Sequence, residues 1–310
     1  MSIAFVFPGQ GAQTIGMGRA LAEAYPAAKA VFDEVDDALG ESLSGLIWDG
    51  DIDTLTLTEN AQPALMATSI AAVRALDAEG INLDGVSYVA GHSLGEYSAL
   101  AAAGTFTISD TARLLRTRGL AMQQAVPVGE GAMAAILGLD FDTVTEVAEK
   151  ASQGQVCQVA NANDPAQNVV SGNKDAVERA AVLAKEAGAK RALLLPVSAP
   201  FHCALMAPAA AEMEKALGLV ALQTPRVPLV ANVIAEAVND PEQIKSLLVQ
   251  QVTGQVRWKS SVEWMAANGV TDFWEIGAGK ALTGMIRRIA KDAQTRSIGT
   301  PDDIKAALEA

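Results

Sequence analysis

Short apolar runs rich in valine, isoleucine or aromatic residues alternate along the chain with alanine-rich stretches of helical character. The clearest runs are Ile3–Phe7, Val86–Ala90, Leu229–Val233 and Asp272–Ile276. Each is followed by glycine or polar residues, which is typical of a buried strand that ends in a loop. Because strands that alternate with helices form a parallel sheet wrapped by those helices, the main part of the chain is expected to have an α/β fold.

Residues 129–197 carry a different pattern, in which the elements come in the order βαββαβ of a ferredoxin-like unit. The predicted elements are the strand Ala132–Leu137, the helix Asp142–Ala151, the strands Gln155–Ala160 and Asn168–Ser171, the helix Lys174–Ala187 and the strand Ala192–Pro196. This order closes on itself. It therefore predicts a small domain inserted into a large domain of residues 1–128 and 198–310, with hinges at Pro127–Gly131 and Val197–Pro200. A substrate is expected in a cleft between the two domains.

The charge and the cysteine content exclude several classes of protein. The 310 residues include 36 acidic and 23 basic ones, and the net charge of -13 argues against nucleic acid or an anionic membrane as a partner. Two cysteines without CxxC spacing and two histidines indicate neither a disulfide framework nor a Cys/His zinc site. Met1–Phe7 lacks the basic region of a secretion signal, and the uncharged stretch Ala192–Ala211 contains three prolines. We therefore expect a cytoplasmic protein without a membrane span.

The segment Gly91–Gly95 reads GxSxG, and it lies between the strand Val86–Ala90 and a helix predicted at Glu96–Ala103. A serine on a sharp strand-to-helix turn is exposed in strained backbone geometry, and the helix N-terminus faces the reacting carbonyl. This context favours Ser93 as a nucleophile over the alternative, a glycine-rich turn with an N-capping serine. A tetrahedral intermediate also needs an oxyanion hole. The Leu94 amide is one candidate donor, and the loop Pro8–Gly11 is a candidate source of the second.

A serine hydroxyl needs a neighbouring base at neutral pH, and only His92 and His202 can serve by residue type. His92 adjoins Ser93 in a tight turn, so its ring is expected to point away into supporting structure. This leaves His202, which follows the predicted small domain; the alternative is a packed structural histidine. Cys203 is interpreted as a small apolar residue, because no glycine-framed turn presents its thiol. No acidic residue is obviously placed to complete a triad, so orientation of the imidazole by a backbone carbonyl stays open.

Arg118 shares one face of the predicted helix Asp110–Gln123 with apolar residues, by i, i+3 and i+4 spacing. A guanidinium in such a stripe needs a carboxylate partner, since an unpaired buried charge is very costly. The partner is either an acid of the protein, which makes an internal salt bridge, or a carboxylate of the substrate. The spacing alone leaves both interpretations open.

Blocks spread over essentially the whole chain resemble the malonyl-CoA:acyl carrier protein transacylases of bacterial fatty-acid synthesis and the related acyltransferase domains of polyketide synthases. The blocks are Phe7–Gly11, Gln62–Leu65, Gly91–Gly95 with Glu96 and Tyr97, Arg118–Gly119 with Met122–Gln123, Gly131–Met133, Asn161 and Asn163, Pro200–His202, Glu275–Gly277 and Gly279–Lys280. Several separated blocks in the order of the family make this resemblance a strong signal.

The resemblance implies an α/β-hydrolase-like large domain with a ferredoxin-like insert, in agreement with the pattern of elements. It implies that Ser93 is the nucleophile, that His202 is its base and that the backbone amides of Gln10 and Leu94 are the oxyanion donors. Arg118 would pair with the malonyl carboxylate. The substrates would be malonyl-CoA and acyl carrier protein, no metal or redox cofactor would be needed, and a monomer is expected.

Three positions refine this interpretation. Phe201 resembles the malonyl-selective members of the family rather than the methylmalonyl-selective ones. Arg257 stands where many relatives carry glutamine; if the backbone carbonyl of this residue orients the histidine, the exchange has no effect. Ala278 stands where proline is frequent. The rival functions are a serine thioesterase or esterase, in which water resolves the ester, and a carrier-binding module without catalysis.

Docking of an acidic carrier protein would need local basic patches on this acidic chain. The available clusters are Lys190 and Arg191 at the end of the small-domain helix, and Lys280, Arg287, Arg288 and Lys291 near the C-terminus. The alternative is that these charges only solvate the surface.

Overall fold

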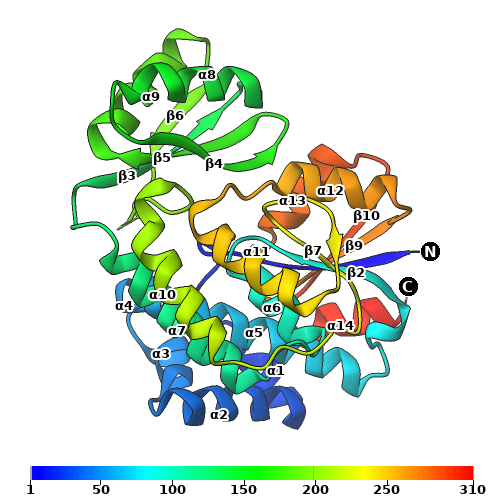
Figure 1. Ribbon diagram of the computed structural model, residues 1–310. Helices are drawn as coiled ribbons and strands as arrows, with labels where there is room; N and C mark the ends of the chain where they lie inside the picture. The colour runs from blue at the N-terminus through cyan, green and yellow to red at the C-terminus, as the bar shows by residue number, and fades with distance from the viewer. Residues whose placement is uncertain (1, 198, 310) are drawn as a thin grey trace.

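The computed structural model of the protein describes residues 2–197 and 199–309. Its larger sheet consists mainly of parallel strands. The order is β10-β9-β1-β2-β7-β8, and all neighbours are parallel except β7 and β8 (Figure 1). The bounds are β1 Ile3–Phe7, β2 Val86–Gly91, β7 Leu229–Val230, β8 Ala237–Val238, β9 Asp272–Ile276 and β10 Gln294–Ile298. Residues 1, 198 and 310, which the predicted domain bounds and one predicted hinge include, lie outside the described residues.

Two of the predicted strands, β1 and β9, have the predicted bounds. The strand predicted at Leu229–Val233 ends at Val230 instead, because the chain turns there: the N–H of Ala231 donates to the carbonyl of Glu236, which closes the connection to β8. The turn frees Asn232 from the sheet.

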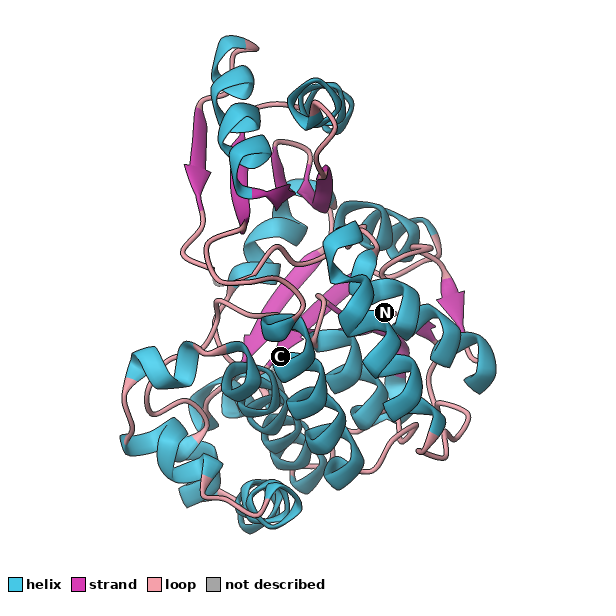
Figure 2. Ribbon diagram, turned by 60° about the vertical axis from the view of Figure 1, so that its left-hand side comes forward, coloured by secondary structure: helices cyan, strands magenta, loops and turns pink. Residues whose placement is uncertain are grey.

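Helices lie on both faces of the larger sheet (Figure 2). Those that precede the smaller sheet in the chain are α1 Arg19–Ala24, α2 Pro26–Leu39, α3 Leu43–Asp49, α4 Ile52–Thr56, α5 Thr58–Ala78, α6 Gly95–Ala102 and α7 Ile108–Gln124. Those that follow it are α10 Ala207–Gly218, α11 Pro241–Thr253, α12 Trp258–Ala267, α13 Ala281–Ile289 and α14 Pro301–Leu308. Among the described residues, no helix combines the length and the apolar character that crossing a membrane requires.

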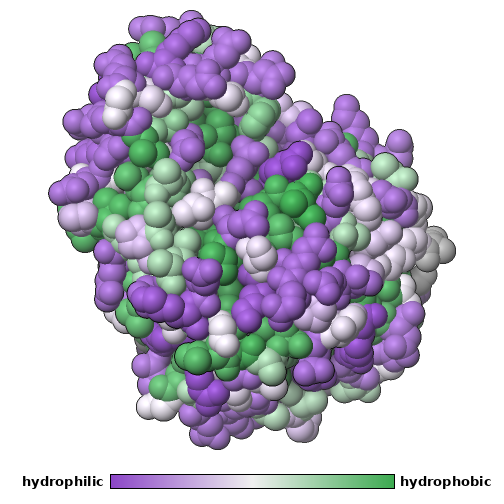
Figure 3. Space-filling view, viewed as in Figure 1, coloured by the Kyte–Doolittle hydropathy of each residue, from purple (hydrophilic) through white to green (hydrophobic). Residues whose placement is uncertain are grey.

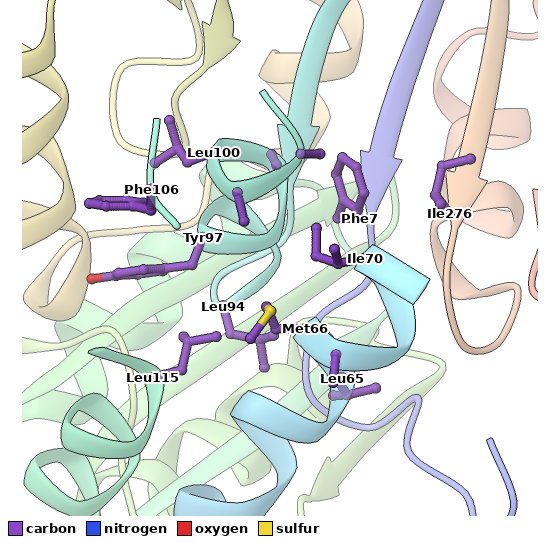
Figure 4. Close-up of a cluster of buried hydrophobic side chains, with 14 of the residues drawn as sticks. Phe7, Leu65, Met66, Ile70, Leu94, Tyr97, Leu100, Phe106, Leu115 and Ile276 are labelled. Atoms are coloured by element: carbon purple, nitrogen blue, oxygen red, sulfur yellow. The ribbon is translucent and has the colours of Figure 1, made fainter. Parts of the chain in front are cut away.

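The central strand β1 is buried on both faces, since successive residues of a strand point to opposite sides. Phe5 and Phe7 belong to the core formed with α5, α6 and α7, whereas Ala4 and Val6 pack with residues of α12 and α13. Figure 4 shows the first of these cores directly under the start of α6, where Leu94 lies close to Met66. The turn that carries Ser93 therefore rests on a packed apolar base.

The smaller sheet has the order β4-β5-β3-β6 with antiparallel neighbours, and it stands apart from the larger sheet in Figure 1. In the space-filling view of Figure 3, seen from the same side, this part of the chain forms the upper lobe of the surface. Its elements follow the predicted order: β3 Gly131–Leu137, α8 Phe141–Ser152, β4 Cys157–Asp164, β5 Gln167–Asn173, α9 Lys174–Glu186 and β6 Arg191–Leu194. Helices α8 and α9 pack on one face. Met133, Ala160 and Val169 on the sheet join the core of the larger part, so both faces are covered.

Strand β4 ties the smaller sheet to the larger part of the molecule. Val256 donates from its N–H to the Ala160 carbonyl at 2.8 Å and accepts from the N–H of Ala162 at 3.0 Å. At the end of β4, the buried carboxylate of Asp164 pairs with Arg288 of α13 at 2.7 Å. These contacts hold the smaller sheet in addition to the two chain crossings predicted as hinges.

Candidate active site

Ser93 lies on the turn between β2 and α6, with a positive φ of 55°. The flanking glycines are required by close packing: a Cβ on Gly91 would overlap the backbone of Gly95, and a Cβ on Gly95 would overlap the carbonyl of Phe7. Asn232, which follows the end of β7, holds this turn in place. Its Oδ1 accepts from the N–H of Ser93 at 2.9 Å, and its Nδ2 donates to the Gly91 carbonyl at 2.7 Å. The predicted elbow is therefore present.

The imidazole of His202 lies against the nucleophile candidate, with 2.7 Å between Nε2 and the Oγ of Ser93. Its Nδ1 lies 2.9 Å from the carbonyl oxygen of Gln251 and 3.2 Å from that of Gly254. Carbonyl oxygens only accept, so Nδ1 carries the proton and Nε2 presents a lone pair to the serine hydroxyl. The geometry is that of a base beside its hydroxyl.

Burial is the main cause that lowers the pKa of His202 to about 3, and the positive charge of Arg118 lowers it further. The imidazole is therefore neutral over the range in which proteins work, which is the state a general base needs. The sequence left open which group orients the imidazole. In the structure, the carbonyl oxygens of Gln251 and Gly254 lie beside Nδ1, in the position that the acid occupies in a triad. The carbonyl of Arg257 is not involved, because it accepts from the N–H and hydroxyl of Ser261 within α12.

Arg118 on α7 is buried, and its guanidinium also contacts the Oγ of Ser93. Nη1 donates to Oε1 of Gln62 at 2.8 Å, while Nη2 donates to Oε1 of Gln251 at 2.8 Å and to Oγ of Ser93 at 3.1 Å. The guanidinium also lies 5.7 Å from the ring centre of Tyr97. Within residues 2–197 and 199–309 no carboxylate pairs directly with Arg118, so the interpretation as an internal salt bridge is wrong.

His92 and Cys203 lie as the sequence predicts. The Nε2 of His92 is 2.9 Å from Oδ1 of Asn163 on β4, and its ring packs on Trp258, away from the serine hydroxyl. Cys203 is fully buried, and its Sγ donates to the carbonyl of Pro200 at 3.1 Å. Burial raises the pKa of this thiol, which disfavours the reactive thiolate.

The two predicted oxyanion donors lie on neighbouring loops at the carboxyl ends of β1 and β2. Strand β1 pairs with β2 so that Phe7 stands beside Gly91, and a Cβ on Gly9 would lie 2.7 Å from the carbonyl oxygen of His92. Within the described part of the chain, the N–H groups of Gln10 and Leu94 make no hydrogen bond with protein atoms. Both amides thus remain available to a ligand beside Ser93.

Two residues of this site, Asn232 and Gln251, were not predicted from the sequence. Gln251 is fully buried at the end of α11, on the same face as Leu247 and Leu248. A polar residue within an apolar helical stripe is the signal that singled out Arg118, and it would have singled out Gln251 as well. Asn232 follows the carboxyl end of β7. Ligands of parallel α/β sheets bind at the carboxyl ends of the strands, so a polar residue at this place is a signal for a site.

The acyl transferase domain family matches residues 4–302 of the chain. A malonyl CoA-acyl carrier protein transacylase of Bacillus subtilis is 47% identical over 308 residues, which cover 99% of this chain and 96% of the relative. The protein of the same name from Escherichia coli K12 is 45% identical over 306 residues, covering 99% and 98%.

Solved structures give the same result. An acyl-carrier-protein-S-malonyltransferase from Bartonella henselae is 58% identical with a TM-score of 0.98, and the match covers 100% of this chain and 99% of that one. A malonyl-transacylase in complex with its type II PKS acyl-carrier protein is 42% identical with a TM-score of 0.97, covering 100% and 99%. Because family, sequence and structure agree over nearly the full length, the chain belongs to the acyl transferase family, among the malonyl CoA-acyl carrier protein transacylases.

Proposed function

We propose that this protein transfers a malonyl group from coenzyme A to the phosphopantetheine thiol of an acyl carrier protein in fatty-acid synthesis. One observation carries the proposal: the Oγ of Ser93 lies 2.7 Å from a neutral imidazole and 3.1 Å from a buried guanidinium. A nucleophile, its base and a receptor for a carboxylate thus meet at one atom. The names of the relatives, and the carrier complex of one solved structure, support the same substrates.

In the first half-reaction, the Oγ of Ser93 attacks the thioester carbonyl while its proton passes to Nε2 of His202. The developing oxyanion would accept from the amides of Gln10 and Leu94, and losing one such donor costs about 2.7 to 4 kcal/mol. When the intermediate collapses, the C–S bond breaks and His202 protonates the leaving thiolate. The carrier thiol then attacks the malonyl ester with the same groups in reverse, which regenerates Ser93.

Specificity is assigned to Arg118 and Phe201. A guanidinium holds a carboxylate through two parallel charge-assisted hydrogen bonds, which a neutral acyl group cannot accept. Phe201 is buried directly before the base, and a bulky ring there leaves little room for an α-methyl group. Arg118 thus favours malonyl over acetyl groups, and Phe201 favours malonyl over methylmalonyl groups.

The finer description of the fold belongs to this proposal. We interpret residues 1–128 and 198–310 as an α/β-hydrolase-like large domain and residues 129–197 as a ferredoxin-like small domain, which the order β4-β5-β3-β6 supports. The cleft between them stays the predicted place for the pantetheine chain. No metal or redox cofactor is assigned a step, because Ser93 and His202 carry the proton and acyl transfers; a monomer in the cytoplasm is expected.

Mass spectrometry of the intact protein after addition of malonyl-CoA tests the function. We expect a covalent malonyl adduct on the wild type and on Cys203→Ala, and none on Ser93→Ala. His202→Ala should acylate at least about 10² times more slowly. Adding holo-carrier protein should move the malonyl group to the carrier. Rapid release of free malonate without an acceptor would identify a hydrolase instead, and a wild type that gains no adduct would indicate a binding module.

A further inference from the structure

The buried charge of Arg118 is balanced at a distance, through the side-chain amide of Gln251. The amide oxygen accepts from Nη2 of Arg118 at 2.8 Å, and the amide nitrogen donates to Oε2 of Glu96 at 2.7 Å. An amide is suited to this position, because its acceptor end faces the cation and its donor end faces the anion. Glu96 on α6 is itself only 1% exposed, so cation, amide and carboxylate form one buried chain.

Glu96 is held weakly for a buried carboxylate. Apart from Gln251, the N–H of Asn232 lies 3.3 Å from Oε2, and Oε1 has no hydrogen-bond partner among the described residues. Burial accordingly raises the pKa of Glu96 to about 7, while the bonds from Gln251 and Asn232 and the charge of Arg118 act in the opposite direction. Ionised and protonated forms of this carboxyl are therefore both populated near neutral pH.

Among the residues that the structure describes, few charged groups face Glu96. Arg118 on α7 is the cation that acts on it. Tyr97, the next residue on α6, is kept neutral because burial raises the pKa of its phenol. His202 is neutral above about pH 4, since its own pKa is lowered to about 3. The charge state of the site between pH 6 and 8 is thus decided by Glu96.

We propose, on the basis of the function proposed above, that Glu96 is the internal counter-ion of Arg118 and sets how strongly the site prefers acyl groups that carry a carboxylate. In the empty site, ionised Glu96 offsets the guanidinium. A malonyl carboxylate supplies a second negative charge beside Arg118, and Glu96 then takes up a proton from solvent. Neutral acyl groups need no such proton. Glu96 is a specificity-determining residue, not a group that touches the reacting atoms.

The sign of the pH dependence follows from this linkage. Below pH 7, Glu96 is protonated and Arg118 attracts the malonyl carboxylate without competition. Above pH 7, ionised Glu96 repels that carboxylate. The rate of Ser93 acylation by malonyl-CoA, divided by the rate with acetyl-CoA, should therefore fall about five- to tenfold between pH 6 and pH 8. Effects common to both thioesters cancel in this ratio.

The decisive variant is Glu96→Gln, which keeps an oxygen acceptor for Gln251 and is neutral at every pH. Its malonyl-to-acetyl ratio should not change between pH 6 and 8, and at pH 8 it should exceed the wild-type ratio by about five- to tenfold. Glu275→Gln is the matched control. Glu275 is another carboxylate of 1% exposure, but it accepts from the N–H groups of Leu282 and Thr283, so its variant should show the wild-type ratios. A Glu96→Gln ratio that falls with pH as in the wild type would overturn the proposal.

A measurement on the wild type keeps the test independent of how the variant folds. Malonylation at pH 7, followed by calorimetry in two buffers of different ionisation enthalpy, should show uptake of roughly 0.4 proton per ester formed. Zero uptake would reject Glu96 as the counter-ion. The two proposals fail separately: a wild type that forms no malonyl ester refutes the proposed function, whereas an ester formed without proton uptake refutes only the role of Glu96.

Discussion

Nη2 of Arg118 donates to Oγ of Ser93 across 3.1 Å, so the cation is in direct contact with the proposed nucleophile. The same Nη2 also donates to Gln251, whose backbone carbonyl orients His202. The guanidinium that we propose as the carboxylate receptor is therefore part of the same hydrogen-bonded framework as the proposed nucleophile and base. An ester formed on Ser93 would have its carbonyl group next to this guanidinium.

If Arg118 holds the malonyl carboxylate as proposed, Arg118→Ala should remove most of the preference for malonyl over acetyl groups. Two charge-assisted hydrogen bonds of about 1.5 to 3 kcal/mol each are lost, so malonyl transfer should fall at least about 10²-fold. Acetyl transfer should hold or rise, because a neutral acyl group accepts neither of these two bonds and so loses nothing when the guanidinium is removed. Transfer rates with malonyl-CoA and acetyl-CoA measure both effects.

Arg118→Lys is the control for this prediction. It keeps the charge but cannot form two parallel bonds, so it should recover only part of the malonyl rate. Equal loss of malonyl and acetyl transfer in Arg118→Ala would instead show that the arginine serves the fold.

Because the imidazole of His202 stays neutral in mild acid, we expect acylation of Ser93 to tolerate a low pH. Because the pKa of His202 is lowered to about 3, acylation of Ser93 by acetyl-CoA should change little between pH 7 and pH 5. A histidine with the ordinary pKa of about 6.5 would be only about 3% neutral at pH 5, and the rate would drop roughly thirtyfold. Single-turnover acylation followed by mass spectrometry distinguishes the two results.

The same histidine links stability to pH. Below pH 6.5, the ordinary pKa of histidine, His202 is protonated in the unfolded chain but stays neutral in the folded protein. The free energy of unfolding is therefore unaffected by this group above pH 6.5 and decreases as the pH falls from 6.5 toward 3. From pH 7 to pH 5 the loss from this one group is about 2 kcal/mol. Urea unfolding at the two pH values should show a smaller loss for His202→Gln than for the wild type. Equal losses would mean that His202 titrates normally.

The fold was predictable where local patterns decide it. Strands β1 and β9 are apolar runs between polar residues, and their bounds agree with the prediction. Strand β10 was missed because it lies at the sheet edge, where only Ile298 of its five residues is buried and no apolar run develops. Position in a sheet, not local composition, makes this segment a strand.

The site was predictable only as far as residue types limit the choice. Two histidines left His202 as the base by elimination, and Ser93 was marked by its glycines. The bonds from Asn232 and Gln251 to Ser93 join residues 139 and 158 positions apart, and spacing within a helix or strand holds no information on such pairs. The partners of Arg118 were open for the same reason.

Charge reversal on the exposed basic clusters tests how the carrier docks. Lys190→Glu with Arg191→Glu, or Lys280→Glu with Lys291→Glu, should raise the apparent KM for the acidic carrier without changing that for malonyl-CoA. Lys190 and Arg191 lie beyond the end of α9, at the start of β6. Arg288 is less suitable than predicted, because it pairs with the buried Asp164 and its loss would leave that carboxylate unpaired.

Lys215→Glu is the matched control, since this exposed lysine on α10 lies outside both clusters. Equal changes in the two KM values for the cluster variants would reject these patches as docking surfaces.

The strained backbone of Ser93 predicts an unusual order of stabilities. At a φ of 55°, a residue with a Cβ costs about 1 to 2 kcal/mol, which glycine does not. Glycine loses about 0.4 to 1 kcal/mol more through the entropy of the unfolded chain, so Ser93→Gly should be more stable than Ser93→Ala by about 0.5 to 1 kcal/mol. Both variants lack the hydroxyl, and neither should form a malonyl ester.

Ser98 in the middle of α6 is the control: it is buried in regular helix, so Ser98→Gly should be less stable than Ser98→Ala by about 1 kcal/mol. Urea midpoints of the four variants measure both differences. If alanine is also the more stable replacement at position 93, the turn holds no strain, and the exposure of the nucleophile must be explained by the packing of Gly91 and Gly95 alone.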